Sequence, residues 1–160
     1  MRNQWDRARV VAALGLILGC TAAGSQHRAL NGLEVLPDSI RWTANAATPP
    51  GAEVAVLVGQ PRSPGLYAFR LRFPSDYKVM PHTHPEDRIY TVLAGTWYIG
   101  LGSVFDSTKV RGFGPGEMYR VPAGTAHFHW AKSGESIVQV NGVGPTATDY
   151  LIPADDPRRK

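Results

Sequence analysis

The chain has 160 residues, of which 43% are hydrophobic and 19% charged, which suits one domain with a real core and argues against disorder. Its net charge of +4 comes largely from the two ends, which hold Arg2, Arg7 and Arg9 and then Arg158, Arg159 and Lys160. No basic stripe with interleaved aromatic residues lies between them, so we expect no nucleic-acid partner and interpret the C-terminal cations as a solvated tail.

Residues 1–20 are typical of an export signal. Three arginines precede an apolar run over residues 10–19, which is too short to cross the roughly 30 Å hydrocarbon core as a helix. Cys20, the single cysteine, ends this run in Ile17-Leu18-Gly19-Cys20, a string that resembles the lipobox of bacterial lipoproteins. A signal-peptidase cut within residues 21–25 and an uncleaved N-terminus are the alternatives. We expect an exported protein, in the periplasm or lipid-anchored at the cell envelope, with no cysteine in its mature core.

The remaining chain indicates an all-β domain. Residues 21–50 are rich in Ala, Thr and Pro and predict a tether with an accessory strand near residues 40–42. Short strands separated by Gly and Pro turns follow, and we expect them at residues 54–58, 69–73, 77–84, 89–93, 96–101, 117–121, 127–130 and 136–140. This spacing predicts an antiparallel β-barrel or two-sheet jelly roll over residues 51–145, followed by a tail over residues 146–160.

Histidines mark the candidate site. His82 and His84 are two residues apart on an expected strand, so both imidazoles lie on one face. His127 begins another expected strand after the turn Pro122-Ala123-Gly124. Three imidazoles that meet inside a barrel suit a borderline divalent metal such as Fe, Mn, Zn, Ni, Co or Cu.

These two segments together resemble the cupin superfamily, whose motifs read G-x5-H-x-H-x3or4-E-x6-G and G-x5-P-x-G-x2-H-x3-N. The matching residues in this chain are His82, His84 and Gly95 in the first motif, and Gly116, Pro122, Gly124 and His127 in the second. The resemblance covers residues 50–145. It implies the cupin barrel, also called a double-stranded β-helix, with His82, His84 and His127 at the family's metal-ligand positions.

Three residues depart from the cupin pattern. Asp76 replaces the first glycine, at a turn that Asp suits, and Ala131 replaces the final Asn. Arg88 stands at the position of the family's glutamate ligand, and a guanidinium cannot coordinate a cation.

The arginine leaves three hypotheses for the site. Glu86 replaces the missing carboxylate ligand, or His129 adds a fourth nitrogen from the same strand face as His127. In the third hypothesis no metal binds, and Arg88 instead grips a carboxylate or phosphate of a ligand. The simpler interpretations are a salt bridge from Arg88 to Glu86 or Asp87, and a packed or hydrogen-bonded His129.

Two main functions fit these residues. One is a metal-dependent enzyme, either a dioxygenase-like oxidoreductase or an isomerase, that acts on a small oxygenated or anionic molecule, with Arg88 and Glu86 as catalytic candidates. The other is a non-catalytic barrel that binds a small molecule or a metal ion, and a purely structural envelope protein is a third hypothesis. Residues 89–93 are apolar on both faces, which predicts a homodimer.

Overall fold

The computed structural model describes residues 34–159. The predicted signal segment, Cys20 and the predicted tether up to residue 33 lie outside the described residues. The strands are β1 (Thr43–Ala44), β2 (Glu53–Val58), β3 (Gly65–Phe73), β4 (Tyr77–Thr83), β5 (Arg88–Ala94), β6 (Trp97–Leu101), β7 (Arg111–Phe113), β8 (Met118–Val121), β9 (His127–Ala131), β10 (Ser136–Gly144) and β11 (Asp149–Tyr150). The helices are short 3₁₀ turns, η1 (Pro37–Ser39), η2 (Pro153–Asp155) and η3 (Pro157–Arg159).

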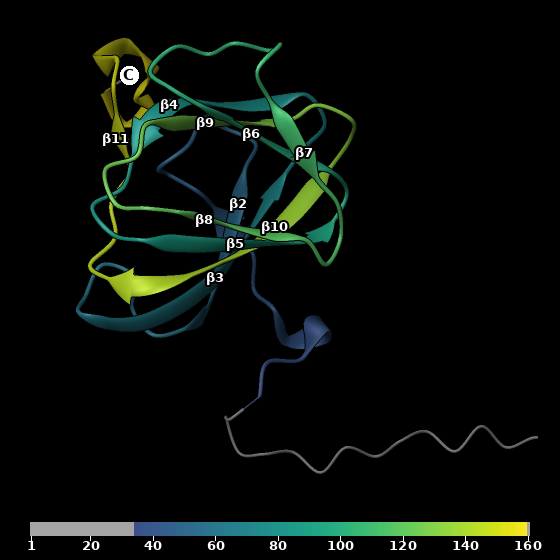
Figure 1. Cartoon of the computed structure of the whole chain (residues 1–160). Helices are drawn as coiled ribbons and strands as arrows, with labels where there is room; N and C mark the ends of the chain where they lie inside the picture. The colour runs from purple at the N-terminus through teal and green to yellow at the C-terminus, as the bar shows by residue number, and fades with distance from the viewer. Residues whose placement is uncertain (1–33, 160) are drawn as a thin grey trace, which may run out of the picture. The chain divides into compact units, whose positions relative to one another are not determined.

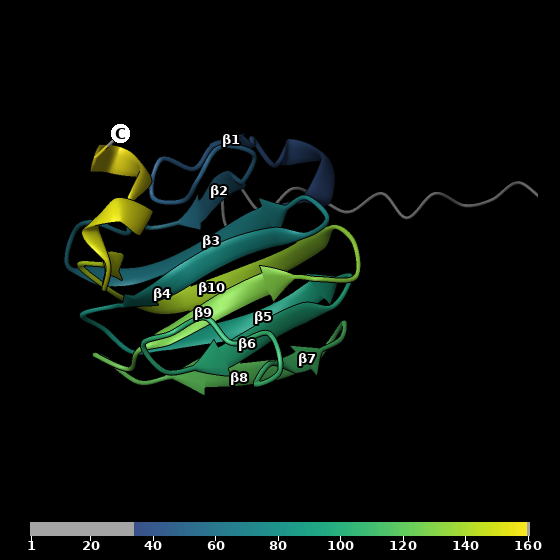
Figure 2. The same ribbon diagram turned by 90° about the horizontal axis from the view of Figure 1, so that it is seen from above.

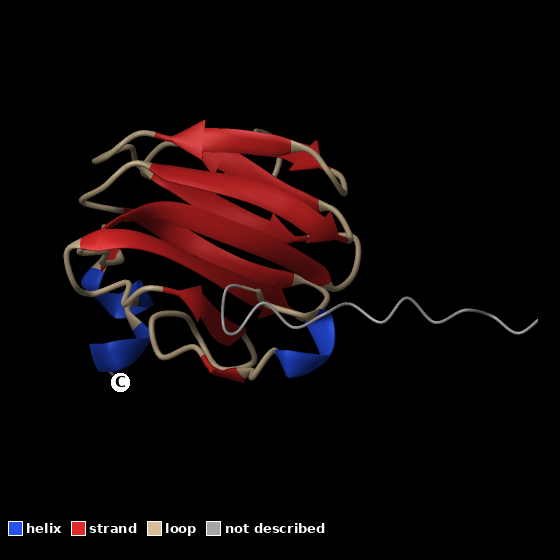
Figure 3. Ribbon diagram, turned by 90° about the horizontal axis from the view of Figure 1, so that it is seen from below, coloured by secondary structure: helices blue, strands red, loops and turns tan. Residues whose placement is uncertain are grey.

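The strands form two antiparallel sheets. The six-stranded sheet has the order β1-β2-β3-β10-β5-β8, and the five-stranded sheet has the order β11-β4-β9-β6-β7. The sheets form two layers in Figure 1, and Figure 2 looks onto them from above. Strands and loops make up nearly all of the ribbon in Figure 3. The predicted all-β jelly roll is therefore confirmed.

Alternation of side chains places the core between the sheets. In β3 the large side chains of Tyr67, Phe69, Leu71 and Phe73 are buried, and Arg70 and Arg72 lie on the opposite face together with the small, buried Ala68. This period of two is what a strand with one buried face requires. The ring of Phe73 stacks on Trp97 of the other sheet with centroids 4.3 Å apart, so the aromatic residues join the two layers.

Two short strands were missed by the sequence prediction, because β7 and β11 are too short to show a hydrophobic period. The predicted accessory strand is present as β1, but it lies at Thr43–Ala44 rather than near residues 40–42. Asp76 has a positive φ of 61°, a conformation that Asp tolerates better than most residues, which agrees with its predicted place in a turn. Within the described residues no helix is long and apolar enough to span a membrane.

The segment predicted as a C-terminal tail packs beside β4. β11 pairs with β4 through Asp149↔Thr83 and Tyr150↔His82. The Tyr150 hydroxyl donates a hydrogen bond to the Ala47 carbonyl oxygen at 3.0 Å. The segment before β2, which contains Ala47, and the segment after β10, which contains Tyr150, thus meet next to the histidine-bearing strand β4.

Candidate metal centre and cavity

His82 and His84 present their ring nitrogens in the same way. His82 is the sixth residue of β4 and His84 follows the end of that strand. The Nδ1 atom of His82 lies 2.7 Å from the Met80 carbonyl oxygen, and that of His84 lies 2.7 Å from the Ala147 carbonyl oxygen. A carbonyl oxygen only accepts, so each Nδ1 carries the proton and each Nε2 keeps its lone pair.

β9 brings two further histidines to the same place. It lies between β4 and β6 in the five-stranded sheet, and its register pairs His127 with His82. The Nδ1 of His127 donates to the Thr125 carbonyl oxygen at 2.8 Å. The Nε2 of His127 is buried without a hydrogen-bond partner among the described residues, so a buried lone pair is left for a ligand to satisfy.

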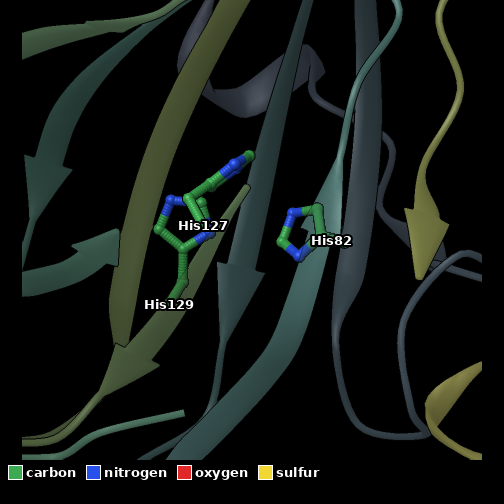
Figure 4. A group of neighbouring side chains, drawn as sticks. All are labelled: His82, His127 and His129. Carbon is green, nitrogen blue, oxygen red and sulfur yellow. The ribbon is translucent and has the colours of Figure 1, made fainter. Parts of the chain in front are cut away.

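The four imidazoles form one buried cluster. Ligand nitrogens of His82, His127 and His129 all lie within 4.8 Å of one another, and Figure 4 shows His127 and His129 facing His82. The ring centroid of His84 is 4.8 Å from that of His82 and 5.0 Å from that of His127. The structure therefore groups His129 most closely with two predicted ligands, and His84 lies directly beside them.

Two tyrosine hydroxyls contact the cluster. Tyr90 lies 3.2 Å from the Nε2 of His84, and Tyr119 lies 3.0 Å from the Nε2 of His129. These tyrosines are paired in register between β5 and β8, and their rings stack with centroids 5.0 Å apart. The Nε2 atoms of His84 and His129 are thus each contacted by a tyrosine hydroxyl. Among the described residues, no tyrosine hydroxyl forms such a contact with the Nε2 atom of His82 or His127.

Burial keeps the cluster uncharged. Desolvation lowers the pKa of His82 to about 3 and that of His127 to about 4. It also lowers the pKa values of His84 and His129, with the nearby positive charge of Arg88 as a further cause. At neutral pH all four are neutral imidazoles, the form that binds transition metals.

Arg88 forms the salt bridge to Glu86 that the simpler interpretation predicted. Its Nε donates to Glu86 Oε1 at 2.7 Å, and the two side chains are 6% and 10% exposed. The same Oε1 accepts from the Tyr67 hydroxyl at 2.7 Å and from the Thr146 hydroxyl. These contacts lower the pKa of Glu86 against the opposing effect of its desolvation. The carboxylate is held by this network, outside the group of mutually close ligand nitrogens.

A second nitrogen of the Arg88 guanidinium, Nη2, also donates hydrogen bonds to protein acceptors. Its Nη2 donates to the Thr146 hydroxyl and, at 3.0 Å, to the Ala147 carbonyl oxygen. Only Nη1 lacks a close acceptor, since the Tyr90 hydroxyl lies 3.5 Å away. A bidentate grip on a ligand, the third hypothesis for this arginine, needs two free N–H groups side by side. The geometry opposes such a grip, because Nε and Nη2 of Arg88 already donate to Glu86, Thr146 and Ala147.

A cavity of about 830 Å³ opens onto the histidines. Its wall includes His82, His84, His129, Tyr90 and Trp97, together with apolar side chains of β2 and β3. Tyr90 and Trp97 are core residues that also line this space.

All of the charged side chains among the described cavity-lining residues are arginines. They are Arg62, Arg88 and Arg158. Arg158 is exposed, as the interpretation of a solvated tail expects, but it also binds Asp156 at 2.7 Å and the Thr148 carbonyl oxygen at 2.7 Å. No motif marks Arg62 or Arg158, since only the tertiary fold brings residues 59–63 and the C-terminal segment to one cavity.

Solved structures share this architecture. The structure of KdgF from Halomonas sp. superposes with a TM-score of 0.54 at 21% identity, covering 68% of this chain and 91% of that one. The polyketide cyclase RemF from Streptomyces resistomycificus gives a TM-score of 0.65 at 16% identity, covering 78% and 89%. An RmlC-like cupin protein from Ralstonia eutropha gives 0.57 at 18% identity, covering 75% and 72%. This chain has the cupin fold. No family model and no curated protein matches the sequence.

The cupin barrel and its histidine cluster together suggest a divalent metal. The solved structures share the fold at 16–21% identity, so the choice of ligands depends on the geometry of this chain alone.

Proposed function

We propose that this cupin binds one divalent transition metal through His82, His84, His127 and His129, and uses it to hold a small anionic molecule in the cavity. The observation that carries the proposal is the buried, unpartnered Nε2 of His127. It lies in a cluster where His82 and His84 also carry their protons on Nδ1. A buried lone pair without a donor, such as that of His127 Nε2, is costly in a metal-free core and is satisfied by a cation.

The donor set indicates the class of metal. Imidazoles without a carboxylate favour Zn, Cu, Fe or Ni over Mg or Ca. His129 supports the hypothesis of a fourth nitrogen, because its ligand atom lies within 4.8 Å of those of His82 and His127. When bound, such a metal would supply a Lewis acid that polarises an oxygen of the ligand.

Charge supports an anionic ligand. Four neutral imidazoles would leave the double positive charge of the metal uncompensated. The nearest carboxylate, Glu86, already pairs with Arg88. A negatively charged molecule would complete the balance from the cavity side, where the wall has no acidic residue among those described.

The lack of an acidic residue on the described cavity wall favours binding over turnover, so metal-dependent catalysis is the second candidate function. Glu86 and Arg88, the two catalytic candidates, bind each other and are poorly placed to exchange a proton with a ligand. Metal-dependent catalysis stays a hypothesis alongside binding, and RemF, an enzyme by its name, has a similar fold. Turnover in this protein would depend on the metal and its histidines rather than on a carboxylate base.

Metal content tests the main proposal. The purified full chain is incubated with Zn²⁺, Fe²⁺, Ni²⁺ or Cu²⁺ in turn, dialysed, and its metal measured by elemental analysis. We expect about one metal per chain for the wild type, and a metal content at least tenfold lower for His82→Ala and for His127→Ala. His27→Ala, the change of the remaining histidine, is the matched control and should leave the content unchanged. Wild-type protein that retains none of these metals would overturn the proposal.

We also propose that the protein is exported, on the basis of its N-terminal sequence. Arginines, a short apolar run and Cys20 in a lipobox-like string support this location. Mass spectrometry of the N-terminus of protein from a cell-envelope fraction tests the idea. A lipidated Cys20 or a free N-terminus within residues 21–25 is the expected result, and an intact Met1 would contradict it.

A further inference from the structure

The cavity contains one cation that no carboxylate neutralises. Arg88 pairs with Glu86, and Arg158 pairs with Asp156. Arg62 is an exposed residue that lines the cavity, and it forms no hydrogen bond or ion pair within the part of the chain that the structure describes. An unpaired guanidinium at a cavity presents a planar set of N–H donors suited to a carboxylate or a phosphate.

The turn that carries Arg62 is fixed in place. The Ser63 amide donates to the Gln60 carbonyl oxygen at 2.9 Å, and the Thr146 amide donates to the Pro61 carbonyl oxygen at 2.7 Å. The turn packs so closely on Gly144 that a Cβ there would lie 2.3 Å from the Ser63 carbonyl oxygen. The position of the Arg62 backbone is therefore set by the end of β10, and only its side chain has freedom.

An apolar wall lies in the same cavity. Phe69, Leu71 and Phe73 of β3 line it, together with Val54 and Val56 of β2. Val56 is 54% exposed although it is on the cavity side. Such a wall favours a ligand with a hydrocarbon or aromatic body, because the burial of apolar groups away from water is favourable.

We infer that the cavity binds an organic anion with an apolar body, whose anionic group pairs with Arg62 and whose body lies against β2 and β3. The far end of such a ligand would approach the histidines, and this last step depends on the proposed metal function. Recognition by Arg62 does not, because it needs only the cavity and the fixed turn. Arg62 is thus a specificity-determining residue that no cupin motif indicates.

Three probes of equal chain length test this recognition: hexanoate, hexyl phosphate and hexanamide. Binding to the full chain is measured by isothermal titration calorimetry, for metal-free protein and for protein with a measured metal content. We expect at least one anion to bind tenfold more tightly than hexanamide, and whichever anion does so identifies the headgroup. Arg62→Gln should weaken binding of that anion at least fivefold and leave hexanamide unchanged. Arg62→Lys should retain part of the affinity.

A matched control separates local from general charge effects. Arg70 lies on the outer face of β3, where its Nε donates to Gln139, so Arg70→Gln should bind like the wild type. Equal binding of hexanamide and both anions, an Arg62→Gln variant with unaltered affinities, or no binding of any probe would each overturn the inference. A protein that shows the Arg62 effect but binds none of the metals after incubation would refute the metal proposal alone. The failure of one proposal can therefore be told from the failure of the other.

Discussion

His84 and Arg88 donate hydrogen bonds to the same acceptor, the carbonyl oxygen of Ala147, at 2.7 Å and 3.0 Å. One backbone group therefore fixes both the imidazole tautomer of His84 and the position of the arginine that stands where cupins have a glutamate ligand. Arg88 connects the histidine cluster to the C-terminal segment and to Glu86. Its place is structural in this chain, because it forms a buried ion pair with Glu86.

Removal of Arg88 should destabilise the fold strongly. Arg88→Met keeps most of the apolar stem but leaves Glu86 buried without its cation, and breaking a buried pair in this way costs about 3–5 kcal/mol. The free energy of unfolding, measured by urea titration, should fall by this amount. Glu86→Gln/Arg88→Met should recover part of the loss, because the unpaired charge is then gone.

An exposed ion pair gives the control for this measurement. Arg120 and Asp87 are 61% and 52% exposed, and such pairs contribute less than about 1 kcal/mol. Arg120→Met should therefore have a small effect. Equal losses for Arg88→Met and Arg120→Met would show that the buried network does not stabilise the protein.

The histidine cluster should make the metal-free protein sensitive to mild acid. His82 and His127 have folded-state pKa values of about 3 and about 4, against an ordinary value of 6.5. Above pH 6.5 both states are neutral and the full stability is present. As the pH falls below 6.5, the unfolded chain takes up protons that the folded chain does not. Each such histidine then lowers the free energy of unfolding by about 1.4 kcal/mol per pH unit.

Urea titrations of chelator-treated protein between pH 7.5 and 5.0 measure this slope. His127→Gln should have a shallower slope than the wild type, whereas His27→Ala should keep the wild-type slope. If His127→Gln shows the wild-type slope, His127 takes up its proton in the folded state too.

The Tyr90 hydroxyl should compete with a metal for His84. It lies 3.2 Å from the Nε2 atom, and breaking a hydrogen bond of this kind costs about 1 kcal/mol net. Tyr90→Phe removes that competitor and should raise metal affinity about fivefold, as measured by competition with a chromophoric chelator. Tyr98→Phe, which removes a hydroxyl bonded to exposed Ser133, should change nothing. Weaker metal binding by Tyr90→Phe would show that the phenol orients His84 instead.

The sequence predicted the barrel well because its signals are local. Alternation in residues 69–73 and the turns at Gly95 and Gly116 depend only on neighbouring residues. In the structure β3 contains residues 69–73, β5 ends just before Gly95, and β8 begins just after Gly116. His82 and His127 were also predictable, since their strand positions and the cupin spacing both place them inside.

Long-range relationships were harder to predict. The pairing of Glu86 with Arg88 was expected as one alternative, but its bonds to Tyr67 and Thr146 join residues about 20 and 60 positions apart. Arg62 has no motif and acquires its place through contacts of its turn with Gly144 and Thr146. Side chains that converge only in the tertiary fold leave no period in the sequence.

The outer face of the six-stranded sheet supports the proposed homodimer. Leu66, Ile89, Leu93, Met118 and Val143 share this face and are 38–75% exposed. We therefore expect sedimentation velocity to give a dimer for the wild type. Ile89→Glu should shift it to a monomer, because a buried carboxylate without a partner opposes association. Leu101→Glu places the same charge at an exposed residue of the other sheet and should leave the dimer intact. A wild-type monomer at micromolar concentration would refute this assembly, because these exposed apolar side chains would then face solvent and not a second copy of the chain.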